Sequence, residues 1–455
     1  MDKKLNEAVA ALRPQMVAAL QRLVRRRSVE ADPLPGKPFG EEVDACFAEA
    51  LTLCHELGFE TTDMDRYIGW CEIGTGDEMV AVLGHLDVVP EGEGWHHPPY
   101  AAGIEGGRLY GRGAIDDKGP VVASLFALKA IRDLGIPLNR RVRLLFGLNE
   151  ETNDRDVLYY KAHGGEIPVL GFTPDGEYPL INGEKGILNG TYTRTLHQTG
   201  DYILTRFEGG EASNISPAYA VAEVKCPAEA ASKIAAEKVT VTPIDGGIRV
   251  EAEGVAVHGS TPELGENAIG RLAMALEQLP FTGETGECLA FVSERLGMET
   301  HGESLGLAMR DGISGDLTMN VGVASFENEA LSLTFSVRYP VTLPYELVYP
   351  RLKRGFTLGG FTETEMTHAA ALYIPKDSEL IRRLLGVYEA ETGEKAEPKC
   401  IGGGTYAKSM PNIVAFGPIF PGDEVREHKP DEYMETRRVI QNAEIIASAM
   451  KALAE

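Results

Sequence analysis

Hydrophobic and polar residues alternate along the first part of the chain with the periods of helices and short buried strands. Residues 41–58 and 119–135 carry apolar side chains at helical spacing, whereas 79–89 and 140–149 are short apolar runs. Short apolar strands that alternate with helices of this length predict an α/β domain. We expect a mainly parallel, mixed sheet with helices on both faces.

The pattern changes at about residue 190. Residues 239–257 read as a hairpin that turns at Asp245-Gly246-Gly247, and residues 267–280 read as a helix. A second hairpin is expected over 317–341 and a second helix over 344–356. Two successive units of a hairpin and a helix suggest an inserted α+β domain that arose by imperfect internal duplication.

The α/β pattern returns after Ile374, with helices expected over 378–393 and 436–455 and a strand over 412–420. A chain of 455 residues is also too long for one ordinary core. We therefore predict that residues 1–187 and 376–455 form the first domain and that residues 188–375 form an inserted lid domain.

The termini and the composition exclude several classes of protein. Residues 1–30 have amphipathic helical spacing, in which Pro14 either kinks one helix or opens a second. They resemble no signal peptide, and no apolar run is long enough to cross a membrane. The net charge of −24 argues against nucleic acid or an anionic membrane as partner. Six cysteines without paired spacing favour the cytoplasm.

Histidine and acidic residues recur where apolar runs end. The candidate metal ligands are His85, Asp116, Glu150, Glu151, Asp175 and His428. Nitrogen and carboxylate ligands suit Zn²⁺, and this set is too large for one tetrahedral ion with an open position. It suits two ions about 3.5–4 Å apart that share a carboxylate. Asp87 lies on the same strand face as His85 and could hold the other nitrogen of its ring.

Each motif also has an ordinary structural explanation. A histidine at a strand end often bonds a nearby aspartate, and Asp116 or Asp117 could cap the following helix. The pair Glu150-Glu151 could be a solvated turn, and Asp175 lies in a Pro-Asp-Gly turn sequence. His428 could be an exposed loop residue. The motifs gain weight only as an ordered set.

As a set, the motifs resemble one family over almost the whole chain. GHLDVVP, GRGAIDDKG, NEET, TPD and EHKPDEY are similar to the motifs of the di-zinc peptidases. That family includes aminoacylases, acetylornithine deacetylase and succinyl-diaminopimelate desuccinylase. The length and the enlarged insertion resemble its Xaa-His and β-Ala-Xaa dipeptidase branch, the peptidase V or carnosinase-like type.

The resemblance implies a role for each candidate residue. His85 and Asp175 would hold one Zn²⁺, Glu151 and His428 the other, and Asp116 would bridge them; Mn²⁺ or Co²⁺ could substitute. Asp87 would orient His85, and Glu150 would be the general base and acid. The peptide bond between Asp116 and Asp117 would be cis, and Asp117 would hold no metal.

The resemblance extends into the insertion. His258 would polarise the scissile carbonyl. Asn214 and Arg338 would bind the substrate, and Arg338 would do so by pairing with the carboxylate of the substrate. The glycine-rich loop 402–407, with Gly403, Gly404 and Thr405, would offer backbone amides to that carboxylate. For Arg338 a surface ion pair, and for His258 a turn position, are the structural alternatives. The sequence departs from the family pattern at Thr152-Asn153-Asp154, which puts the local loop shape in doubt.

The expected function is hydrolysis of dipeptides or short peptides in the cytoplasm. The alternatives are an N-acyl amino-acid deacylase and, outside the enzymes, a metal-stabilised peptide-binding protein. Glu150 disfavours the latter, because a binding protein needs no general base beside its metals. The lid histidine of this family often comes from a partner subunit, but an enlarged lid can supply it in cis, so we expect a monomer.

Overall fold

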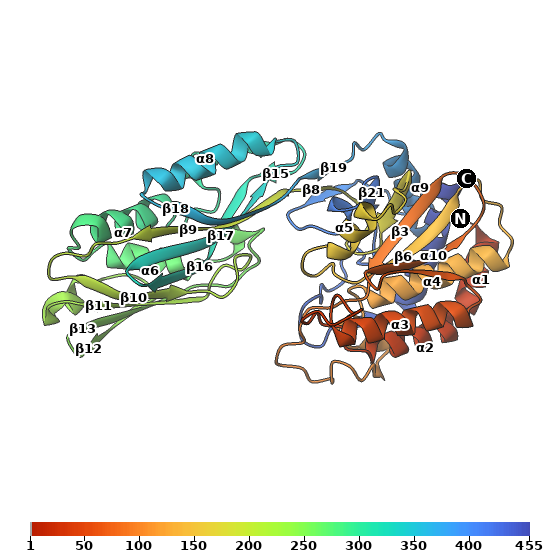
Figure 1. Ribbon diagram of the computed structural model, residues 1–455, viewed down its shortest axis with the longest axis horizontal. Coiled ribbons are helices and arrows are strands. Elements are labelled where there is room, and N and C mark those ends of the chain that lie inside the picture. Colours follow the sequence, from red (N-terminus) through yellow and green to blue (C-terminus); the bar gives the residue numbers. More distant parts are fainter. Residues whose placement is uncertain (1) are drawn as a thin grey trace. The chain divides into compact units, whose positions relative to one another are not determined.

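The computed structural model describes residues 2–455 and divides into two compact units (Figure 1). Unit 1 comprises the residues up to Asn182 together with Ile374–Lys399 and Gly404–Glu455. Unit 2 comprises Gly183–Tyr373 and Cys400–Gly403. Each unit encloses a hydrophobic core of its own. Among the described residues, no helix has the length and apolar character needed to span a bilayer.

A mixed sheet forms the centre of unit 1, as predicted. Its strands are ordered β1-β2-β6-β3-β7-β21-β8. The four central strands are parallel and the flanking strands run antiparallel to their neighbours. The bounds are β1 (Thr61–Met64), β2 (Ile68–Ile73), β3 (Met79–His85), β6 (Arg141–Gly147), β7 (Leu170–Thr173), β8 (Ile181–Glu184) and β21 (Ile413–Ala415). Short strands β19 (Leu372–Tyr373) and β20 (Lys399–Ile401) pair with β8.

Helices lie on both faces of this sheet. The ring of Phe47 in α3 lies over Gly69 of β2, where a Cβ would stand 2.5 Å from the ring. The next residue, Trp70, points to the opposite face and meets Tyr160 of α5 edge-on. The helices of unit 1 are α1 (Lys3–Ala11), α2 (Arg13–Val24), α3 (Glu41–Glu56), α4 (Lys118–Asp133), α5 (Arg155–Ala162), α9 (Glu379–Thr392) and α10 (Thr436–Ala454).

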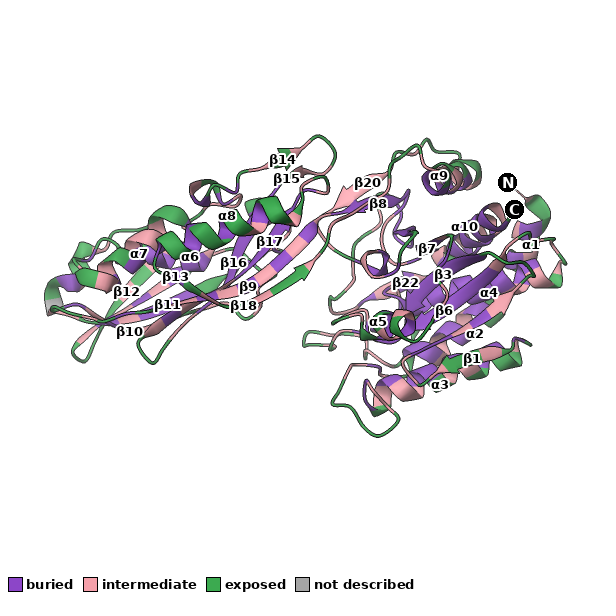
Figure 2. Cartoon of the chain, turned by 45° about the horizontal axis from the view of Figure 1, so that its top comes forward, coloured by how far each residue is buried: buried purple, intermediate pink, exposed green. Residues whose placement is uncertain are grey.

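Strand β3 and helix α4 lie deep in the core of unit 1. Every residue of β3 is buried, and α4 packs beside α10 against this strand (Figure 2). Pro14 lies in the first turn of α2, so it opens a second helix rather than kinking one. A small sheet of β4 (Ile104–Glu105), β5 (Arg108–Tyr110) and β22 (Tyr433–Glu435) completes the unit.

Unit 2 is an antiparallel sheet with helices on its buried face. The strand order is β12-β13-β11-β10-β16-β17-β9-β18, so both predicted hairpins, β12–β13 and β16–β17, lie in one sheet. The strands are β9 (Gly186–Thr195), β10 (Ile203–Gly209), β11 (Tyr219–Lys225), β12 (Val239–Ile244), β13 (Gly247–Glu253), β16 (Thr318–Glu327), β17 (Ala330–Tyr339) and β18 (Thr362–Ala369). The helices are α6 (Ala268–Leu276), α7 (Gly283–Arg295) and α8 (Tyr345–Leu358).

Candidate metal centre

Three neighbouring parallel strands carry candidate ligands at their carboxyl ends. His85 is the last residue of β3, Glu150 and Glu151 follow β6, and Asp175 follows β7. Because β6, β3 and β7 are parallel neighbours, these ends meet at one edge of the sheet. Open α/β sheets place their sites at this edge.

Asp116 joins the candidate ligands into two groups. Its Oδ1 lies 3.0 Å from Nε2 of His85, which is also 3.8 Å from Asp175. Its Oδ2 lies 3.0 Å from Nε2 of His428, and the same nitrogen is 3.0 Å from Glu151. All five predicted ligands therefore come together, as one group around His85 and one around His428 that share Asp116.

The donor set of both groups fits a divalent cation. Nε2 of His85 is buried and has no hydrogen-bond partner among the described residues, although two carboxylates lie beside it. Three carboxylates and two imidazoles give both sites oxygen and nitrogen donors and an excess of negative charge. Zn²⁺ and related borderline ions prefer such donors.

The electrostatics of the two histidines are dominated by this negative charge. Burial would lower the pKa of His85, but the carboxylates of Asp116 and Asp87 raise it well above its usual value. Burial likewise opposes the charge of His428, yet Asp116 and Glu151 raise its pKa to about 11. Burial would raise the pKa of Asp116, but its close contacts with the two histidines hold it below its usual value. The centre therefore attracts positive charge.

The pKa values of Glu150 and Asp175, unlike that of Asp116, are raised. Burial, followed by the charge of Asp175, raises the pKa of Glu150 well above its usual value. Burial and the charge of Asp116 raise the pKa of Asp175 to about 7. Among the described residues, no hydrogen bond or ion pair holds the side chain of Glu150, which also stands outside both ligand groups. Its carboxyl is thus available for proton transfer.

Two acidic residues position His85. Nδ1 of His85 bonds the backbone carbonyl oxygen of Asp87 at 3.0 Å, while the Asp87 carboxylate lies 3.4 Å away and accepts the Glu151 amide at 3.0 Å. Asp117 stands at the N-cap of α4 but accepts the His85 amide instead of capping the helix. The predicted cis bond between Asp116 and Asp117 is present.

One important contact of the centre escaped the sequence analysis. Glu432 is fully buried, pairs with Arg112 at 2.7 Å, and accepts backbone N–H groups of Gly113, Ile115 and Asp116. It therefore holds the loop that presents Asp116. Glu432 lies within the EHKPDEY motif, but its pairing with a loop more than three hundred residues earlier leaves no local pattern.

A cavity of about 550 Å³ opens beside the centre within unit 1. Asp87 and Glu151 lie in its wall, together with Val88 and Pro90 of the segment after β3. Glu30 and Arg155 line it as well, and they form an ion pair. This space is large enough for a small ligand next to the metal groups.

In unit 2, the predicted substrate-contacting residues Asn214 and His258 lie on segments that pair with each other. The Gly259 amide donates to the backbone oxygen of Asn214 at 2.6 Å, and Ile215 pairs with His258 in an isolated bridge. The amide of Ser260 donates to Nδ1 of His258 at 3.2 Å. A neutral His258 ring then carries its proton on Nε2.

Arg338 is a buried cation on β17. Arg338 is 6% exposed, and burial lowers its pKa to about 10. Its Nε has no hydrogen-bond partner among the described residues. Within residues 2–455 no carboxylate pairs with it, so the surface ion pair considered as an alternative is absent. A buried guanidinium without a counter-ion is costly unless a ligand supplies one.

The glycine-rich loop spans the boundary of the two units. Gly403 belongs to unit 2, whereas Gly404 and Thr405 belong to unit 1. The hydroxyl of Thr405 accepts the Ala407 amide at 3.1 Å and so shapes the short helical turn that follows.

Comparison with known proteins gives matches over almost the whole chain. The model of peptidase family M20/M25/M40 matches residues 81–452. YtjP of Bacillus subtilis (strain 168), whose dipeptidase assignment is provisional, is 35% identical over 99% of this chain and 100% of its own. The Beta-Ala-Xaa dipeptidase of Lactobacillus delbrueckii subsp. lactis is 31% identical over 100% of this chain and 99% of its own. Human carnosine dipeptidase 1 has a similar fold, with a TM-score of 0.59 at 16% identity over 99% and 98% of the chains.

Proposed function

The chain belongs to peptidase family M20/M25/M40, and we propose that it hydrolyses dipeptides at two divalent ions. The resemblance to metal-dependent peptidases is thereby confirmed, whereas the substrate and the number of ions are our proposal. The observation that carries it is Asp116, whose two oxygens face different histidines. Zn²⁺ suits these donors best, and Mn²⁺ or Co²⁺ could replace it.

Glu150 is the proposed proton carrier. When bound, the ions would polarise the scissile carbonyl and make the attacking water more acidic. Glu150 takes the proton of that water and delivers it to the leaving amine. Glu150 lies outside both ligand groups, and no hydrogen bond or ion pair among the described residues holds its carboxyl, which supports this role. Asp87 keeps His85 and the Glu151 backbone in place.

Three residues of unit 2 are assigned to the substrate. Arg338 binds its carboxylate, which would supply the counter-ion that this buried guanidinium lacks. His258 donates from Nε2 to the oxygen of the scissile carbonyl as negative charge develops there. Asn214, whose backbone is bonded to the segment of His258, adds a polar contact. Backbone amides of Gly403, Gly404 and Thr405 complete the carboxylate site.

The dipeptide assignment is supported by the names of the relatives, which disfavour both alternatives. A direct test compares matched pairs, such as alanyl-leucine with N-acetyl-leucine and N-succinyl-leucine, in the presence of Zn²⁺, Mn²⁺ or Co²⁺. We expect kcat/KM for the dipeptide to be at least about tenfold higher, a difference of about 1.4 kcal/mol in the barrier. Faster release of the acyl group would assign a deacylase, and no turnover of any pair would assign a binding protein.

Location and assembly complete the proposal. All six cysteines are free thiols, which supports a reducing compartment such as the cytoplasm. We further propose that the chain acts as a monomer on short peptides.

A further inference from the structure

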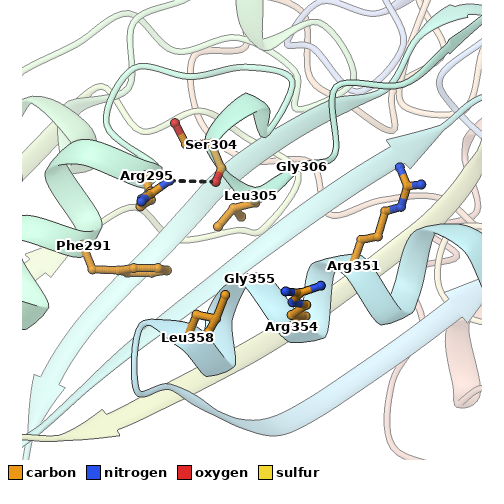
Figure 3. Close-up of a pocket in the computed structure, with 9 residues that line it drawn as sticks. All are labelled: Phe291, Arg295, Ser304, Leu305, Gly306, Arg351, Arg354, Gly355 and Leu358. Atoms are coloured by element: carbon orange, nitrogen blue, oxygen red, sulfur yellow. Dashed lines mark hydrogen bonds between the residues drawn. The ribbon is translucent and has the colours of Figure 1, made fainter.

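Unit 2 contains a cavity of about 470 Å³ that the proposed reaction does not use (Figure 3). It lies between α7, the short helical turn Glu303–Leu305 and α8. Every residue that lines it belongs to unit 2, whereas all the candidate metal ligands belong to unit 1. The cavity therefore shares no residue with the metal centre.

Three guanidinium groups stand around this cavity. Arg295 lies at the end of α7, and Arg351 and Arg354 lie on α8 (Figure 3). Arg295 donates to the carbonyl oxygen of Ser304 at 3.3 Å, and Arg351 lies 3.4 Å from the sulfur of Met309. Within residues 2–455, no carboxylate lines the cavity or forms an ion pair with any of the three.

The missing carboxylates are unexpected in this chain. Acidic residues outnumber basic ones by 68 to 44, and many other arginines pair with acidic residues. Arg141 and Arg143, for example, each pair with both Glu72 and Glu166. Like-charged groups repel one another, so three unpaired guanidinium groups around one space leave it open to an anion.

Apolar side chains also line the cavity. Phe291, Leu305 and Leu358 line it, and 77% of the Leu358 surface is exposed. The floor forms where α8 approaches the helical turn, because a Cβ on Gly355 would stand 3.0 Å from Leu305. A ligand for this cavity therefore needs a charged end and an apolar body.

We propose that this cavity binds a small organic dianion, a phosphate monoester or a dicarboxylate, whose charged end lies among the three arginines. Guanidinium groups bind phosphate and carboxylate through two parallel hydrogen bonds, so two or three arginines match the oxygens of a dianion. The apolar body of the ligand packs against Phe291 and Leu358. The site is a second binding site that does not depend on the proposed peptidase reaction.

Calorimetric titration of the metal-loaded, full-length protein tests this site. The probes are phenyl phosphate, phthalate and inorganic phosphate, and the variant is the double substitution Arg351→Gln with Arg354→Gln. We expect phenyl phosphate or phthalate to bind the wild type and to bind the variant at least about tenfold more weakly. The matched control is Lys353→Gln, because Lys353 lies on the same helix but contacts Tyr349 and Glu363 instead of the cavity.

The apolar wall has its own test. Leu358→Ser should weaken binding of phenyl phosphate but leave that of inorganic phosphate within about twofold. If the double variant is poorly folded, Arg354→Lys serves instead. It keeps the positive charge but should still weaken binding of the probes, because lysine cannot form the two parallel hydrogen bonds of a guanidinium group. Equal affinity of the wild type and the arginine variants, or no saturable binding by the wild type below about 10 mM, would overturn the proposal.

Discussion

At the scale of single residues, the centre depends on carboxylates that contact two groups at once. Asp116 faces His85 with one oxygen and His428 with the other. Asp87 lies beside the His85 ring and accepts the Glu151 amide. A change in either carboxylate would therefore disturb both ligand groups.

The first prediction concerns the proposed bridge. Asp116→Ala removes the carboxylate that the two ligand groups share, so the purified variant should hold fewer than two ions per chain. Its melting temperature should also fall, since bound metal stabilises the native state. Metal analysis and thermal unfolding measure both effects. Asp77→Ala, which removes an exposed carboxylate, is the control; two tightly bound ions in Asp116→Ala would refute the bridge.

The residues of the centre could be predicted from sequence to different extents. His85 ends an apolar strand, and Glu151 and Asp175 follow two others, a position that itself points to a site. Glu432 could not be recognised, because its role arises from contacts with Arg112 and the loop before Asp116 that only the folded chain creates. The burial of Arg338 away from the carboxylates of the described residues likewise depends on the folded structure and could not be predicted from the sequence.

At the scale of elements, periodicity predicted most of the long helices and the parallel strands β3 and β6 well. The antiparallel strands β1 and β2 lie beside the parallel centre. Their short, partly polar sequences did not indicate in which direction they run relative to the neighbouring strands. Helix α7 was not predicted, since Gly283 and Gly286 weaken its helical pattern. The strand expected over 412–420 ends at Ala415, shortly before the cis bond between Gly417 and Pro418.

The second prediction concerns the contact between β3 and α4. A Cβ on Gly84 would stand 2.5 Å from the Asp117 carboxylate and 2.6 Å from Val121. Gly84→Ala should therefore destabilise the protein by about 1–3 kcal/mol. It should also weaken metal binding, because Asp117 holds the His85 amide. Chemical denaturation and metal titration measure these effects. Gly103→Ala is the control, since nothing lies near its Cβ, and equal stability of the two variants would contradict the close packing.

At the scale of the whole molecule, the chain has two cores, and all the candidate metal ligands lie in unit 1. Removing the metal should therefore loosen unit 1 and leave the sheet of unit 2 unchanged. Hydrogen exchange before and after chelation measures this. We expect faster exchange over 113–117 and 148–151 and constant protection in β16 and β17. Equal loss of protection in both units would show that they unfold together.

The next prediction concerns assembly. If His258 acts within its own chain, a mixture of inactive Glu150→Gln and inactive His258→Ala proteins should stay inactive. In a dimer that exchanges His258, each chain could repair the defect of the other. Peptidase assays of the mixture, with each variant alone as control, distinguish these cases. Recovered activity would refute the proposed monomer but would leave the role of His258 intact.

The central claim is that Glu150 moves the proton at a metal centre that it does not help to build. The most direct measurement is metal content together with kcat for Glu150→Gln, a change that keeps the size of the side chain but removes its acid–base function. We predict that the variant keeps the wild-type metal content and melting temperature while kcat falls by about 10²–10⁴-fold. Near-normal kcat with full metal content would contradict the account.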